Sequence, residues 1–268
     1  MKSRLLIFLF ISVLPFISQA QKGIRDGCTM TSPPVIDCKF NDWQTEWMLD
    51  PNGKFIYNVC NDADNLYVRL KVSDDLTQRK IGLFGLTVFL NPEGKKIGKL
   101  GLKYPVSKDP DEMKRLTASE GPMNAAQLEA IKRKLIEDSE VLEFVGLSKQ
   151  SIVSTRLGLM NGLQVFITTD SAGNYVYEAK IPFKAFHIKK SAVKVLGVAF
   201  VTGKLIPPKG SQTATPSPTG VAYGNSPMMG QGYNNRGGMN SHAQTFYRPV
   251  NYGPFSSSTY FSVGIKLQ

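Results

Sequence analysis

The stretch FIYNVCNDADNLYVRLKVSDD, residues 55–75, decides how this chain folds. Apolar residues recur at every second position in FIYNV (55–59) and again in NLYVRLKV (65–72). A period of two predicts a strand with one face in a core and the other in water. Between the two runs, residues 61–65 are mostly Asn and Asp, which favour turns because their side chains bond to their own backbone. The stretch therefore predicts a β-hairpin.

Short strands are expected along most of the remaining chain. A polar connection follows the hairpin, and then LTVFL (86–90) is apolar at consecutive positions, as in a central strand buried on both faces. A helical insertion is expected at about 109–138, where Asp109 and Asn124 are suitable N-caps. This order predicts an all-β fold, an antiparallel β-sandwich formed as a single domain by residues 35–268. The other expected strands are at 99–104, 141–147, 151–159, 163–169, 175–181, 193–202 and 258–267.

The first 20 residues have the features of a secretory signal peptide. Lys2 and Arg4 precede an apolar run at 5–17, and small residues follow it up to Ala20. Cleavage after Ala20 predicts a secreted or periplasmic protein. Residues 21–34 are expected to form an irregular leader, and no later apolar run is long enough for a transmembrane helix.

The composition changes at about 207–254, where Gly, Ser, Asn, Pro, Thr and Tyr predominate. Such a segment buries little apolar surface, so we expect a long, flexible, low-complexity loop before the last strand. Loops of this length in a compact domain are often functional. Tyrosines set among Asn, Ser and Gly form an adaptable recognition surface, and a surface loop without specific contacts is the alternative.

The chain has three cysteines, Cys28, Cys38 and Cys60. Two of them can pair in an oxidising compartment, and any of the three pairings would tie the N-terminal segment to itself or to the hairpin. One thiol is left over. We do not expect it to be catalytic, because neither histidine forms a recognisable Cys-His arrangement with it.

The net charge of +11 belongs to the C-terminal third of the chain. After Glu178 there are ten lysines and arginines and no Asp or Glu, which leaves +1 for residues 1–178. Such asymmetry attracts anionic partners, and a solvated basic face is the simpler explanation. No nucleic-acid partner is expected, since the cations are dispersed and no nucleic-acid-binding motif accompanies them.

Four motifs occur in a characteristic order. They are IDCKFNDW (36–43), NLYVRLKVSDD (65–75), GLTVFLN (85–91) and YEAKIP (177–182). Together they resemble the opening D-G-x-x-D-x-W motif and three later strands of carbohydrate-binding module family 9-like domains, which belong to the wider DOMON-like group. The resemblance extends from about Val35 to Val201 and includes the last strand. Cys38 stands where the opening motif usually has Gly.

The resemblance implies a non-catalytic β-sandwich that binds sugars in many relatives, sometimes with structural calcium. Aromatic rings, Trp in particular, grip the sugar in such relatives, and the only tryptophans here are Trp43 and Trp47. Trp47 is a candidate platform for a sugar, although both indoles could instead be buried where the opening segment crosses the sandwich. The other candidate ligand-binding residues lie in the flexible loop: Tyr223, Tyr233, Arg236 and Tyr247.

Carboxylates suggest two further kinds of site. Oxygens near Asp62 and Asp64, or those of Asp74 and Asp75, could bind calcium. The first pair is explained more simply as part of a hairpin turn and the second as the end of a strand, and neither pair has the spacing of an EF-hand. Glu178 could be paired with a second carboxylate as in a glycosidase, yet it already matches a Glu of the resembled strand. We expect no cofactor, with calcium as the exception considered, and no enzymatic activity.

The sequence therefore predicts a secreted, non-catalytic binding module whose ligand is a glycan, contacted by loop aromatics and by the basic C-terminal face. The alternative is a cell-envelope interaction protein that keeps the fold without binding sugar. Its basic C-terminal third would contact a protein or an anionic envelope component. An exposed aromatic platform in a concavity would favour the first interpretation.

Overall fold

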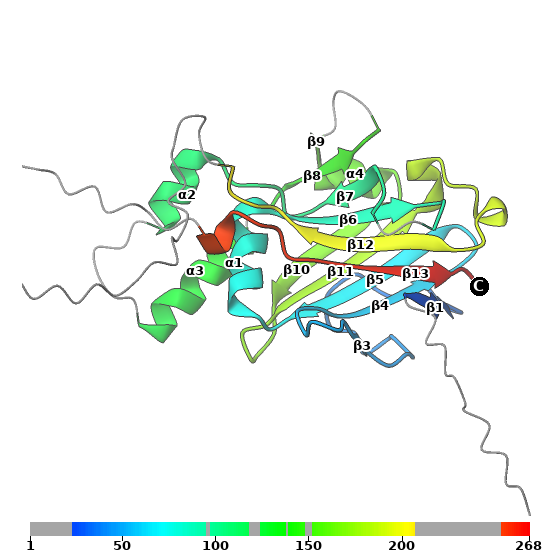
Figure 1. Ribbon diagram of the computed structural model, residues 1–268, viewed down its shortest axis with the longest axis horizontal. Helices are drawn as coiled ribbons and strands as arrows, with labels where there is room; N and C mark the ends of the chain where they lie inside the picture. The colour runs from blue at the N-terminus through cyan, green and yellow to red at the C-terminus, as the bar shows by residue number, and fades with distance from the viewer. Residues whose placement is uncertain (1–22, 95–96, 118–123, 138, 148–151, 207–252) are drawn as a thin grey trace, which may run out of the picture.

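Two β-sheets face each other and enclose one large apolar core (Figure 1). The computed structural model describes residues 23–94, 97–117, 124–137, 139–147, 152–206 and 253–268. The strands are β1 (Ile24–Asp26), β2 (Cys28–Thr29), β3 (Met48–Leu49), β4 (Ile56–Asn61), β5 (Asn65–Val72), β6 (Leu86–Asn91), β7 (Leu100–Lys103), β8 (Val141–Val145), β9 (Ile152–Ser154), β10 (Gln164–Thr169), β11 (Tyr175–Pro182), β12 (Leu196–Thr202) and β13 (Tyr260–Lys266). The helices are α1 (Asp75–Phe84), α2 (Pro110–Thr117), α3 (Ala125–Glu137) and α4 (Thr155–Met160), and the 3₁₀ turns are η1 (Phe183–Phe186), η2 (Lys190–Ala192) and η3 (Gly253–Phe255).

The strand order confirms the predicted β-sandwich. The first sheet runs β1-β13-β12-β6-β7-β8-β9, and the second runs β10-β11-β5-β4-β2 with β3 also paired to β4. The predicted hairpin is the antiparallel pair β4–β5, and the predicted central strand is β6, between β12 and β7. Two short pairs, β1–β13 and β2–β4, are parallel, so the sheets are mixed rather than purely antiparallel.

The segment expected to be an irregular leader contributes strands to both sheets. β1 extends the first sheet beside β13, and β2 extends the second beside β4. A disulfide joins Cys28 of β2 to Cys60 of β4, which selects one of the three pairings that the sequence leaves open, and Cys38 stays a buried free thiol. These two strands were not predicted from the sequence, because strands of two or three residues are specified by their distant partners rather than by a local pattern.

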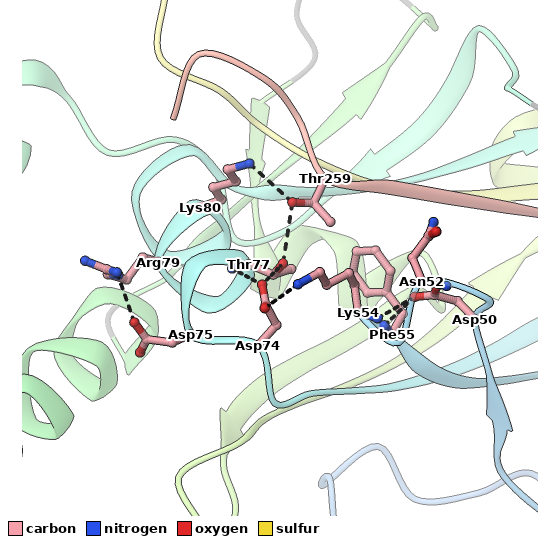
Figure 2. Close-up of polar contacts among 10 residues, drawn as sticks. All are labelled: Asp50, Asn52, Lys54, Phe55, Asp74, Asp75, Thr77, Arg79, Lys80 and Thr259. Carbon is pink, nitrogen blue, oxygen red and sulfur yellow. Dashed lines mark hydrogen bonds and ion pairs between the residues drawn. The ribbon is translucent and has the colours of Figure 1, made fainter. Parts of the chain in front are cut away.

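A helix, α1, replaces the polar connection expected after the hairpin. Asp74 is its N-cap and accepts hydrogen bonds from the Thr77 amide (3.0 Å) and hydroxyl (2.6 Å), as Figure 2 shows. Lys54 Nζ lies 2.5 Å from the other Asp74 oxygen, so the cap also joins α1 to the turn before β4 (Figure 2). Gly85 ends the helix with φ 85°, a left-handed conformation that glycine adopts at little cost.

The helical insertion forms as predicted and covers one end of the sandwich. The Asp109 side chain accepts from the Glu112 amide, and Asn124 and Gln127 form a reciprocal capping box at the start of α3. α1, α3 and η3 gather at the end opposite the C-terminus (Figure 1), around a small second core that includes Leu83, Phe84 and Leu135.

The strand predicted at 151–159 is mostly helical. Only β9 is extended, and α4 begins directly after Ser154, whose hydroxyl accepts from the Leu157 amide at 3.2 Å. Gly158 faces Leu142 of β8, so α4 packs close to the first sheet. The predicted loop at 207–254 lies outside the described residues except for its last two.

Candidate functional site

The opening segment, residues 30–47, crosses the outer face of the second sheet and buries a row of polar side chains. Strand alternation sends Tyr177 and Ala179 into the core and Glu178 outward. Glu178, Arg69 and Asn58 are opposite one another on β11, β5 and β4, and each is at most 3% exposed. Buried polar groups need partners, and the opening segment supplies them.

Glu178 holds the opening segment through three hydrogen bonds. Its Oε2 accepts from the amides of Asp37 (3.0 Å) and Cys38 (2.8 Å), and its Oε1 accepts from Trp43 Nε1 (2.5 Å). Burial raises the pKa of Glu178, and the three donors act against that rise. We call this arrangement the Glu178 latch. A fully buried carboxylate with both oxygens engaged has the geometry of a structural anchor rather than of a catalytic acid.

Arg69 occupies the space between the two tryptophans. Its guanidinium carbon lies 4.7 Å from the Trp43 ring centroid and 4.0 Å from that of Trp47, both within cation–π range. Arg69 also donates to the Thr45 carbonyl. Burial lowers the pKa of Arg69 to about 10, with Glu178 and Asp42 acting in the opposite direction, so the cation persists at neutral pH. Trp43 is buried, as expected if the opening segment packs its indole against the sandwich, whereas Trp47 is 37% exposed.

Cys38 fixes the path of the opening segment toward β10. It is buried, and its thiol lies 3.4 Å from the Val176 carbonyl and 3.6 Å from that of Phe166. Its φ of 60° is left-handed, a conformation that favours glycine over a residue with a side chain. The preceding residues, Pro33 to Ile36, are thereby placed beside β10.

The first cavity lies between the start of the opening segment, β10 and α4. Its volume is about 680 Å³, and we call it the β10 cavity. Val35, Leu159 and Phe166 line it and are exposed large apolar side chains, Phe166 at 44%. Its polar lining includes Arg156 and Lys180. The cavity is therefore an apolar concavity with an accessible aromatic ring and two cations.

The second cavity, of about 540 Å³, adjoins the first because Lys180 lines both. It lies where β11 runs into η1, so we call it the η1 cavity. Lys184, Lys190 and Asp64 of the β4–β5 turn are among the residues that line it. The two neighbouring cavities, which share Lys180 in their lining, are together called the groove below.

Of the predicted ligand-binding residues, the structure describes Trp47, and Trp47 does not lie in the groove. Trp47 lines neither cavity, and its ring has Arg69 over one face and the Phe40 ring perpendicular to it, 5.1 Å between centroids. The remaining candidates lie outside the described residues: Tyr223, Tyr233, Arg236 and Tyr247. The sequence does contain a signal for three of the groove residues. Strand alternation places Gln164, Phe166 and Lys180 at outward-facing positions of predicted strands, where a ligand could contact them.

Among the carboxylates considered for calcium, Asp62 and Asp74 have local structural partners. Asp62 accepts from the Asp64 and Asn65 amides and from the Tyr67 hydroxyl (2.6 Å), closing the β4–β5 turn. Asp74 caps α1. In the part of the chain that the structure describes, no three His, Cys, Asp or Glu side chains lie close enough together to hold a metal ion. The helices described here are all too short or too polar to cross a membrane.

Comparison with known proteins finds similarity at the level of fold. No protein-family model matches the chain. No curated protein matches it. Among solved structures it is similar to a carbohydrate binding module family 9 (CBM9) from Caldicellulosiruptor kristjanssonii, in complex with glucose in one case and with cellotriose in the other. Each match is 14% identical and covers 66% of this chain and 75% of that chain, with TM-scores of 0.32 and 0.33.

Proposed function

We propose that this protein is a secreted or periplasmic, non-catalytic module that binds a glycan in the groove. The observation that carries the proposal is the β10 cavity, a concavity on the outer face of the second sheet with an exposed phenyl ring, Phe166. Small-ligand sites are typically concave, mostly apolar and about 300–1,000 Å³, and both cavities fall within that range.

The side chains of the β10 cavity match the two surfaces of a sugar ring. Phe166, Val35 and Leu159 offer apolar contact to its C–H faces. The Gln164 amide and the Lys180 ammonium, opposite each other on β10 and β11, offer hydrogen bonds to its hydroxyls. Additional contacts from the loop residues Tyr223, Tyr233, Arg236 and Tyr247 belong to the same proposal.

A glycan-array screen of residues 21–268 tests the proposal. Wild type, Phe166→Ala and Trp47→Ala would be compared, with Tyr260→Ala as a control because Tyr260 is an exposed aromatic residue that lines neither cavity. We expect glycan binding that Phe166→Ala abolishes and Tyr260→Ala leaves unchanged. Loss only in Trp47→Ala would move the site to the opening segment. Absence of binding to any glycan by the wild type would refute the proposal.

A second candidate function, contact with a protein of the cell envelope, is favoured by one observation. Large apolar side chains are exposed together on β9, α4 and β10, and clustered exposure of this kind often marks an interaction surface. They are Ile152 (61%), Leu157 (45%), Leu159 (54%), Met160 (78%) and Phe166 (44%). A pull-down that compares wild type with Met160→Ser distinguishes this function from glycan binding. Met160 lines neither cavity, so its replacement should weaken binding to a protein partner and leave glycan binding unchanged.

A further inference from the structure

We infer that the ligand of the groove is an acidic glycan, a chain that carries carboxylate or sulfate groups on successive sugars. The inference rests on the proposed function and specifies its ligand class. It comes from the charge of the groove, to which α4, β11, η1 and η2 each contribute a cation.

Four cations are spread along the groove. Arg156 of α4 lies in the β10 cavity, Lys184 of η1 and Lys190 of η2 lie in the η1 cavity, and Lys180 of β11 lies in both. Asp64 is the one acidic residue in the lining of either cavity. A ligand that occupies the groove therefore meets an excess of positive charge along its whole length.

Among the residues that the structure describes, no carboxylate forms an ion pair with Arg156, Lys180, Lys184 or Lys190. Lys190 Nζ donates instead to a backbone carbonyl, that of Asp62, at 3.0 Å. By contrast, Lys71 of β5 pairs with Asp170 at 2.7 Å, and Lys39 of the opening segment pairs with Asp37 at 2.9 Å. The four groove cations are thus available to an anionic ligand.

The shape of the groove favours a chain over a single anion or a membrane. The cations are distributed over two adjoining cavities rather than converging on one point, which matches charge repeated along a polymer. Phe166 lies beside Arg156 and Lys180 in the lining of the β10 cavity, so a sugar face and an acidic group can be bound in the same cavity. A flat lipid surface could reach the rim of these concavities but not fill them.

The test compares a short oligogalacturonate with its methyl ester, which has the same sugars without the charges. Affinities would be measured by calorimetry at two salt concentrations, for wild type, Lys180→Gln and the control Lys194→Gln. Lys194 is an exposed lysine of the same basic third that lines neither cavity. A hydrogen bond between an ammonium and a carboxylate is stronger than one between neutral groups, so Lys180→Gln should weaken binding about tenfold or more.

The expected result is binding of the acid that weakens with salt, binding of the ester at least about tenfold weaker, and no change in Lys194→Gln. Equal, salt-independent affinity for acid and ester would overturn the acidic ligand while leaving glycan binding intact. Equal losses in the two lysine variants would also overturn it, because the attraction would then be general to the basic face. Binding to anionic vesicles but not to the oligogalacturonate would overturn it in favour of a lipid surface. Binding to neither sugar, together with an empty glycan array, would refute the proposed function itself.

Discussion

Replacing Glu178 by Gln tests whether the latch holds the opening segment on the sheet. The substitution keeps the volume of the side chain but changes one acceptor oxygen into an NH₂ group. If the remaining oxygen still accepts from the Asp37 and Cys38 amides, the new NH₂ group faces Trp43 Nε1, so two donors oppose each other. In the wild type, Trp43 Nε1 lies 2.5 Å from Glu178 Oε1. The reverse orientation sets the NH₂ group against both amides, which is worse.

The magnitude follows from the burial of these groups. A hydrogen bond to a charged acceptor contributes about 1.5–3 kcal/mol, and an unsatisfied buried donor costs about 1–3 kcal/mol. Arg69, 2% exposed, also loses the negative charge opposite it on the neighbouring strand. We expect Glu178→Gln to lower the free energy of unfolding by about 3 kcal/mol. For a chain of this size that is a fall in Tm of about 6–12 °C.

The assay uses the position of the two tryptophans. Trp43 and Trp47 are the only tryptophans in the chain and both belong to the opening segment, so their emission reports on that segment alone. We expect red-shifted emission and greater acrylamide quenching in Glu178→Gln under conditions where circular dichroism still shows the folded sandwich. The charge-matched control is Glu46→Gln, because Glu46 lies in the same segment with an exposed side chain.

Three outcomes would contradict the latch. A Tm within about 1 °C of wild type would mean that the three hydrogen bonds contribute little net stability. A lower Tm with unchanged tryptophan emission would mean that Glu178 stabilises another part of the protein. A red shift of equal size in Glu46→Gln would show that loss of charge, rather than loss of the acceptor, releases the segment.

Three further predictions concern stability. Replacing both Cys28 and Cys60 by Ser opens a loop with a sequence separation of 32 residues and should cost about 3.5 kcal/mol in urea unfolding; a loss below about 1 kcal/mol would argue against this disulfide. Asp74→Ala removes the N-cap of α1 and should cost about 1–2 kcal/mol, whereas the partly exposed Asp75→Ala should cost less than about 0.5 kcal/mol; equal losses in the two variants would refute the cap. Burial alone would raise the pKa of Asp170, but its hydrogen bonds lower it to about 2 from 3.8, so its contribution to stability is complete above pH 3.8 and is lost as the pH falls toward 2. NMR titration should find that low value, and a pKa near 4 would contradict it.

Strand alternation was sufficient to predict most of the sandwich. The runs at 55–59 and 65–72 became β4 and β5 because one face of each packs into the core, and that contact is encoded in the local period. The helix α1 was missed although its signals are present: Asp74 stands three residues before Thr77, and Gly85 follows the last helical residue. A short helix between two strands has few turns in which a period of 3.6 can show.

The groove could not be predicted in this way, because no local pattern contains it. Its walls combine Pro33 to Ile36 with α4, β10 and η1, which come much later in the sequence and meet those residues only in the folded protein. The sequence does show that the basic charge lies in the last third of the chain, and Lys180, Lys184 and Lys190 belong to that third. What it lacks is the distance between them, which depends on how β11 turns into η1 and on the packing of the opening segment.

The latch and the groove depend on the same strand. Glu178 and Lys180 are two positions apart on β11, so alternation places both on the outer face of the second sheet. Glu178 holds Asp37 and Cys38, and the residues directly before them form one wall of the β10 cavity, whereas Lys180 lines the cavity itself. Loss of glycan binding in Glu178→Gln would therefore show only that the wall has moved. Lys180→Gln leaves every hydrogen bond of the latch in place, so a loss of binding with unchanged tryptophan emission in that variant assigns the effect to ligand contact.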